Sequence, residues 1–200
     1  MPDVLYVLRR RKCFITHHRS RASRGWNRGS RITASRSFFS TKRENVLVYL
    51  SNAIEKYFRE TGFSFDGKWQ KWGPYGFSKD GRLRLEEYYP DALISTHKGV
   101  SGYIYSAEEI TDSGFAVQIP DAAASSVPVG VSGAEYVADA YEAILQAERE
   151  GLITVLRYGE MSPAMREWNE RTIKEEYDHA AEHPEYRHFL KGTFPWLING

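Results

Sequence analysis

Arginine side chains concentrate near the N-terminus of this 200-residue sequence, where they could bind phosphate groups. Residues 1–43 contain ten Arg and two Lys but only one acid, Asp3, and so carry a net charge of +11, whereas the remaining residues carry −10. A guanidinium donates two parallel hydrogen bonds to a phosphate, and Trp26, among these arginines, could stack on a nucleic-acid base. The segment therefore predicts binding to nucleic acid or a membrane surface, or a contact with the acidic remainder of the chain.

The same composition is also typical of an organellar transit peptide, which is rich in Arg and Ser and poor in acids. Val4–Leu8, however, has the apolar composition of a core strand rather than the amphipathic pattern of a presequence helix. No apolar stretch of the kind found in a secretory signal follows the basic run, and no run of about 18 apolar residues is present to span a membrane. We therefore expect a cytoplasmic protein without a transmembrane segment.

Two further groups of residues have types that could do chemistry. His179, Glu182 and His183 match the H-x-x-E-H pattern of zinc peptidases, in which two histidines share a helical face. Pro184 follows at once and is expected to end the helix, and no third ligand is indicated, so we expect no metal. The single Cys13 excludes a disulfide framework within the chain and has no assignable His or Asn partner that would make it a nucleophile.

The apolar pattern predicts three helices that would position these groups. A capping box of Thr41 and Glu44 begins the first, which Gly62 ends. The second presents Val137, Ala140, Tyr141, Ile144 and Leu145 on one face and stops at Gly151. The third starts at Ser162 and Pro163, continues to about Ala181, and is followed by a short aromatic tail that carries Tyr186, Phe189, Phe194 and Trp196.

Short apolar or alternating runs predict strands between these helices. The predicted strands are Val4–Leu8, Ser37–Ser40, Arg82–Leu85, Ala92–Ser95, Gly102–Ser106, Phe115–Ile119, Val127–Val131 and Leu152–Leu156. Residues 63–89 are rich in aromatic side chains and contain the turn dipeptides Asp66-Gly67 and Asp80-Gly81, so they predict a β-hairpin or a long flap. The basic stretch Arg9–Arg36 has little periodicity and predicts a loop or extended arm.

These elements predict an α+β fold with short mixed or antiparallel strands and about three helices. The length, the 42% hydrophobic content and the 14% aromatic content fit a single globular domain and argue against a disordered chain. We expect a boundary near residue 36. Residues 1–36 would hold a strand and the Arg/Ser-rich arm or loop, and residues 37–200 would form the acidic α+β body.

Two regions together resemble small bacterial and phage proteins with an ADP-ribosyltransferase-like fold, and the resemblance covers residues 4–158. The first region is Val4-Leu5-Tyr6, the loop Ser20–Ser30, and Ser37-Phe38-Phe39-Ser40-Thr41 leading into a helix. The second is Gly102-Tyr103-Ile104-Tyr105, Gly114-Phe115, Val127-Pro128-Val129 and Glu135-Tyr136-Val137. In that fold a first strand ends in a Tyr and a basic residue, a second carries an aromatic-Ser-Thr segment, and later strands close a nicotinamide cleft.

The resemblance implies a role for particular residues. Arg9 would grip the diphosphate or ribose of NAD, Ser40 and Thr41 would organise the cleft, and Tyr103 would help to bind the cofactor. At most one of three acids would be catalytic; the candidates are Glu108, Glu109 and Glu135. The family's glutamate binds a ribose hydroxyl and stabilises the positive charge that develops as nicotinamide leaves.

The leading hypothesis is therefore an ADP-ribosyltransferase-like protein that binds a nicotinamide nucleotide or a related phosphate ligand. Such a fold does not by itself imply the activity. The alternative is a non-enzymatic nucleic-acid-binding or assembly protein that acts through its basic N-terminal arm. A third possibility is an interaction or immunity-type protein that uses the aromatic residues in 63–77.

Overall fold

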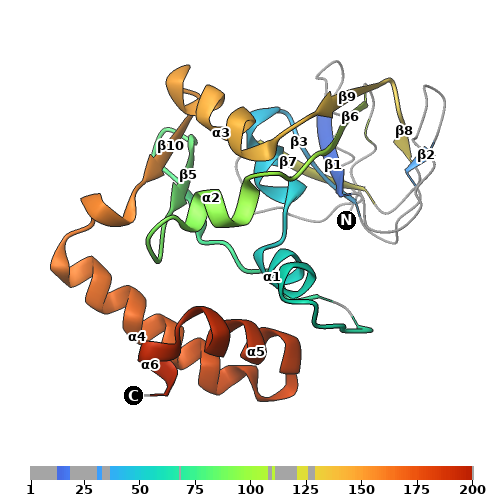
Figure 1. The fold of residues 1–200 in the computed structure, drawn as a ribbon. Helices are drawn as coiled ribbons and strands as arrows, with labels where there is room; N and C mark the ends of the chain where they lie inside the picture. The colour runs from blue at the N-terminus through green and yellow to red at the C-terminus, as the bar shows by residue number, and fades with distance from the viewer. Residues whose placement is uncertain are drawn as a thin grey trace, which may run out of the picture. The chain divides into compact units, whose positions relative to one another are not determined.

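A computed structural model describes residues 13–18, 31–32, 37–67, 69–107, 110, 121–125 and 129–199. These residues combine α-helices, short 3-10 helices and β-strands (Figure 1), which confirms the predicted α+β class. The helices are α1 (Ala53–Thr61), α2 (Ala92–His97), α3 (Ala140–Arg149), α4 (Pro163–His179), α5 (Pro184–Thr193), α6 (Pro195–Ile198), η1 (Glu44–Leu50), η2 (Tyr158–Glu160) and η3 (Ala180–Glu182). The strands are β1 (Cys13–His18), β2 (Arg31–Ile32), β3 (Ser37–Ser40), β4 (Tyr75–Phe77), β5 (Leu83–Glu86), β6 (Gly102–Ala107), β7 (Ala122–Ser125), β8 (Val129–Gly130), β9 (Gly133–Val137) and β10 (Ile153–Leu156).

The described residues gather into two compact units. The first takes its residues from Met1–Leu50, Phe77–Leu83 and Lys98–Ile153. The second takes its residues from Ser51–Gly76, Arg84–His97 and Thr154–Gly200. The expected boundary near residue 36 stays a prediction, because most of residues 1–36 lie outside the described part of the chain.

The first unit is built on a five-stranded antiparallel sheet in the order β7-β3-β1-β6-β9. One face of this sheet carries buried Phe39, Tyr105 and Ala123, which pack with Val129 and Val131. Helix η1 contacts β1, β3 and β6 and contributes no residue to that cluster, so it covers the opposite face. A two-stranded sheet of β2 and β8 completes the described strands of this unit.

The loop expected over Arg9–Arg36 was wrong for residues 13–18. Strand β1 forms there and pairs with β6 along its whole length, from Cys13 opposite Ala107 to His18 opposite Gly102. The segment Cys-Phe-Ile-Thr has aromatic and β-branched residues that favour strands, and pairing on both sides of β1 supplies the backbone hydrogen bonds. The expected strands Val4–Leu8 and Phe115–Ile119 lie outside the described residues, whereas Ser37–Ser40 is confirmed as β3.

The single helix expected from Thr41 to Gly62 is two separate helices, η1 and α1. Asn52 lies between them in extended backbone, and its side chain accepts the N–H of Ile54, which makes it the N-cap of α1. Gly62 ends α1 in the left-handed conformation, at φ 70°, as expected. Thr41 forms no capping box; its backbone N–H and hydroxyl both donate to the carbonyl of Asp121.

The hairpin prediction is confirmed at Asp80-Gly81 but not at Asp66-Gly67, which no described strand flanks, and the neighbouring strand prediction is wrong. β4 and β5 pair across the Asp80-Gly81 turn, where Gly81 has φ 76°, and Leu83 and Leu85 are buried while Arg84 is exposed. The segment expected as the strand Ala92–Ser95 is instead helix α2. A short apolar run does not distinguish a helix from a strand by periodicity, and here Leu93 and His97, four residues apart, share the buried side of a helical turn.

Helix α4 starts at Ser162 as predicted, because Ser162 accepts the N–H of Met165. Helix α3 starts later than expected: Val137 ends β9, and Asp139 caps the helix by accepting the N–H groups of Tyr141 and Glu142. Leu152–Leu156 is confirmed as β10 from Ile153 onward. The segment expected as an aromatic tail is helical, because Pro184 is the first residue of a further helix, α5.

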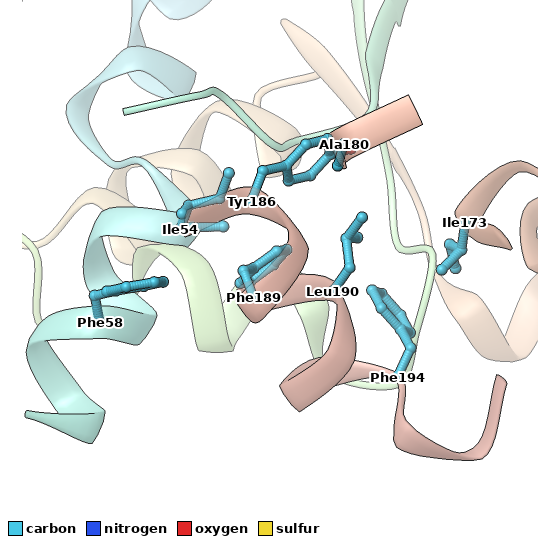
Figure 2. Close-up of a cluster of buried hydrophobic side chains, with 9 residues drawn as sticks. Ile54, Phe58, Ile173, Ala180, Tyr186, Phe189, Leu190 and Phe194 are labelled. Atoms are coloured by element: carbon cyan, nitrogen blue, oxygen red, sulfur yellow. The ribbon is translucent and has the colours of Figure 1, made fainter. Parts of the chain in front are cut away.

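Helix α5 places the C-terminal aromatic side chains in the core of the second unit. Its Phe189 and Leu190 are buried against Ile54 and Phe58 of α1, Ile173 of α4 and Phe194, in a cluster that forms the core of the second unit (Figure 2). Trp72 packs near Phe189 and Phe194 at ring separations of 6.0 Å. Ile54 and Phe58 are fully buried, and aromatic residues beyond Pro184 complete the same core.

Candidate functional site

The turn that leads from β3 into η1 carries two of the predicted site residues, Ser40 and Thr41. Ser40 is buried, and its Oγ accepts the backbone N–H of Lys42 at 3.1 Å. The Thr41 N–H donates to the carbonyl of Asp121 at 2.8 Å, which ties this turn to the residue that precedes β7. Local side-chain-to-backbone bonds of this kind fix a turn, so the direction of the two following side chains is set by β3 and β7.

Those following side chains, Lys42 and Arg43, are cations held by acids from distant parts of the sequence. Lys42 Nζ lies 2.8 Å from Asp121 Oδ2. Arg43 Nε donates to Glu135 Oε2 at 2.8 Å and Oε1 at 3.1 Å, and Nη2 donates to Oε1 as well. The hydrogen bonds that the Arg43 guanidinium donates to Glu135 raise its pKa despite the opposing effect of burial. Both cations remain about a third exposed, at 37% and 36% of the side chain.

The sheet register separates the predicted residues by face. Ser40 lies opposite Phe14 on β1, and Phe14 lies opposite Ser106 on β6. Ile104 lies opposite Glu135 on β9. Because side chains alternate along β6, Glu135 shares a face with Ser40, and that face is the one covered by η1.

Tyr103 lies on the other face. It is opposite Tyr136 in the register, and its ring packs near Tyr136 at 5.2 Å and near Tyr105 at 6.0 Å. These three rings belong to or border the apolar cluster on the Phe39 side of the sheet. The structure therefore places Ser40 and Glu135 on one face of the sheet and Tyr103 on the other, and Arg43 links the turn that carries Thr41 to Glu135.

Three predicted site residues, Arg9, Glu108 and Glu109, lie outside the described residues. Two residues that the sequence interpretation did not single out, Lys42 and Arg43, carry the positive charge beside Ser40 and Thr41. The signal that could have found them is their position, because they follow the Ser-Thr segment directly within the basic first 43 residues.

The histidine pattern near the C-terminus is divided between elements. Helix α4 ends at His179, and His183 is the residue before α5, where its ring lies 3.0 Å from the side-chain amide of Gln70. Within the described ranges, no group of three or more His, Cys, Asp or Glu side chains is arranged to hold a metal ion. The helices of the described part of the chain include none with the length and apolar character needed to cross a membrane.

The arrangement at the β3–η1 turn combines two partly exposed cations, two hydroxyls and two carboxylates. Cations of this kind bind phosphate oxygens by charge-assisted hydrogen bonds. A carboxylate near such a ligand can stabilise developing positive charge. Comparison with models of known families, with curated proteins and with solved structures finds no match to this chain.

Proposed function

We propose that the protein binds a nicotinamide nucleotide, or a related phosphate ligand, at the β3–η1 turn of an ADP-ribosyltransferase-like unit. The observation that carries the proposal is the pair of adjacent, partly exposed cations, Lys42 and Arg43, on the sheet face that also holds Ser40 and Glu135. A diphosphate that contacts both cations would draw them away from partners at opposite edges of the sheet, Asp121 before β7 and Glu135 on β9. The hydroxyl of Thr41 lies in the same turn and can turn its single O–H from the Asp121 carbonyl to the ligand.

Binding of such a ligand requires the cations to exchange partners. Asp121 and Glu135 now neutralise them. The exposed Lys42–Asp121 pair is worth little, typically about 0–1 kcal/mol, whereas the Arg43–Glu135 pair is bidentate. A guanidinium binds phosphate with the same bidentate geometry, so a phosphate can replace Glu135 at Arg43. Glu135 would then be released beside the bound nucleotide, where the resemblance assigns a catalytic acid. Tyr103 has no part in this proposal, because it lies on the opposite face.

The proposal predicts that NAD binds to the whole protein and that Arg43→Gln weakens the affinity at least tenfold, which corresponds to about 1.4 kcal/mol. Lys42→Met is expected to act in the same direction because it removes the second cation. Isothermal titration calorimetry with millimolar NAD, and separately with inorganic pyrophosphate, measures both effects. Lys98→Met, a charge-removing change outside the turn in the same unit, serves as the matched control. Absence of heat, or equal affinity in Arg43→Gln and the wild type, contradicts the proposal.

The alternative function, nucleic-acid binding through the basic N-terminal segment, is favoured by the +11 charge of residues 1–43. Its test cannot be a deletion of residues 9–36. Such a deletion would remove β1, which lies between β3 and β6 in the five-stranded sheet. Substitution of arginines by glutamine removes charge while it keeps the length of the chain.

Replacement of Arg19, Arg21, Arg24 and Arg28 by Gln is therefore the appropriate variant for the alternative. If these residues neutralise phosphates, the slope of log affinity against log salt falls by about 0.7–0.9 for each phosphate that is no longer neutralised. Fluorescence anisotropy with a labelled single-stranded oligonucleotide at several salt concentrations measures the slope. A salt slope identical to that of the wild type excludes a role for these arginines.

A further inference from the structure

A pocket of about 540 Å³ opens in the second unit, between the β4–β5 hairpin and helix α4. Aromatic side chains supply much of its wall: Tyr75 comes from β4, Tyr88 follows β5, and Trp168 projects from α4. Met165 adds a flexible apolar side chain one helical turn before Trp168. The volume lies within the range of pockets that bind small ligands.

The exposure of these side chains is unusual within the described part of the chain. Seven large hydrophobic residues there are exposed, and three of them line this one pocket: Tyr75 at 40%, Met165 at 37% and Trp168 at 49%. Scattered exposed apolar residues need no explanation, but a group of them around one concavity is typical of a binding surface. The grouping therefore points to a ligand with an apolar surface.

The aromatic rings present a corner rather than a stack. The rings of Tyr88 and Trp168 lie 6.2 Å apart, centroid to centroid, with an angle of 80° between their planes. At this separation the two rings are in edge-to-face contact with each other, so a group cannot enter between them but can lie in the corner that they form. The face of an aromatic ring carries negative electrostatic potential and attracts cations, and Trp does so most strongly.

The charged residues of the pocket add a carboxylate to this aromatic corner. Arg84 and Glu86, two residues apart on β5, point to the same side of the strand and form an ion pair. The two partners differ in burial, because the Glu86 side chain is only 14% exposed whereas Arg84 is 50% exposed. The negative charge of Glu86 also acts on Tyr88. Burial is the main cause that raises the pKa of Tyr88, and the charge of Glu86 raises it further.

We propose that this pocket binds an organic cation, such as a quaternary ammonium headgroup, in the corner formed by the rings of Trp168 and Tyr88 and beside the Glu86 carboxylate. A largely buried carboxylate is stabilised by a cation or by hydrogen-bond donors beside it, and Arg84 now supplies the cation for Glu86. Arg84 is half exposed, so it can move into water at small cost when another cation takes its place. The site is independent of the β3–η1 turn, which belongs to the first unit.

The charge of the ligand, rather than its apolar bulk, is tested by a pair of probes with the same shape. Choline carries the quaternary nitrogen, and 3,3-dimethyl-1-butanol is its neutral isostere. Isothermal titration calorimetry on the whole protein is expected to show at least tenfold tighter binding of choline. Trimethyl-lysine and phosphatidylcholine vesicles, tested in separate arms, distinguish a modified peptide from a lipid as the source of the headgroup. Equal binding of choline and its isostere, or binding of neither, overturns the proposal.

Substitutions then assign the contacts. Trp168→Leu and Glu86→Gln are expected to weaken choline binding at least tenfold, because each removes one of the two attractive groups. Arg84→Ala is expected to strengthen it severalfold, because the competing cation is gone, a change that mere structural damage would not produce. Trp196→Leu, at an exposed tryptophan outside the pocket lining, is the control and should leave affinity unchanged. The cation site is rejected if choline affinity is unaltered in both Glu86→Gln and Arg84→Ala. It is also rejected if the pocket binds benzoate, an aromatic anion, and Arg84→Ala abolishes that binding.

Discussion

Replacement of Phe189 by Ala is expected to lower the free energy of unfolding of the second unit by about 3–5 kcal/mol. Phe189 is 2% exposed and lies at the centre of the cluster that joins α1, α4 and α5 (Figure 2). Its ring meets Tyr57 edge to face at 5.6 Å and lies 6.0 Å from Trp72. The cost combines reduced burial of apolar surface with a cavity that neighbours on three different helices cannot all move to fill.

Tryptophan fluorescence during urea unfolding measures this effect directly. Trp69, Trp72, Trp168 and Trp196 belong to the second unit, so the signal reports mainly on it. Phe189→Leu keeps most of the apolar volume and should cost clearly less than Phe189→Ala. Lys191→Ala, an exposed position on the same helix, is expected to change the free energy of unfolding by no more than about 0.5 kcal/mol. A decrease of less than about 1 kcal/mol in Phe189→Ala would mean that this cluster is not a tightly packed core.

The elements that the sequence predicted correctly are those that a local signal specifies. Gly62 ends α1, Asp80-Gly81 turns the hairpin, and Ser162 begins α4, each through a conformation or hydrogen bond within a few residues. The elements that were missed depend on distant partners. Strand β1 is specified by pairing with β3 and β6, and no local feature of its arginine-rich surroundings reveals that pairing.

The candidate site was only partly predictable for a related reason. Ser40, Thr41, Lys42 and Arg43 are consecutive in the sequence, so these four residues are close together in any fold. The pairing of Arg43 with Glu135 joins residues 92 positions apart, and the opposite placement of Tyr103 depends on the register of β6 against β9. A shift of one residue in that register would exchange the faces. Sequence alone does not fix such a register. It could therefore suggest Glu135 and Tyr103 as site residues, but it could not show that they lie on opposite faces of the sheet.

The second large effect is expected at Glu87, a carboxylate that is only 8% exposed. Its Oε1 accepts the backbone N–H of Leu93 in α2 at 3.1 Å, and its Oε2 accepts the N–H of Tyr158 at the start of η2 at 3.2 Å. The Glu87 N–H also donates to the carbonyl of Leu156. Glu87 therefore holds the ends of three segments, α2, β10 and η2. Hydrogen bonds to a charged group contribute about 1.5–3 kcal/mol each.

Replacement of Glu87 by Ala is expected to lower the free energy of unfolding of the second unit by about 2–4 kcal/mol, because two backbone N–H groups are left without their acceptor. Glu87→Gln should cost less, since its single amide oxygen still accepts one of the two bonds while its NH2 group faces the other N–H. Hydrogen exchange resolves the mechanism, because the amides of Leu93 and Tyr158 should lose protection in Glu87→Ala, and one of them should lose it in Glu87→Gln. Glu170→Ala, an exposed glutamate of α4, is the matched control. Wild-type protection at both amides in Glu87→Ala would show that other contacts, rather than this carboxylate, hold α2 and η2 in place.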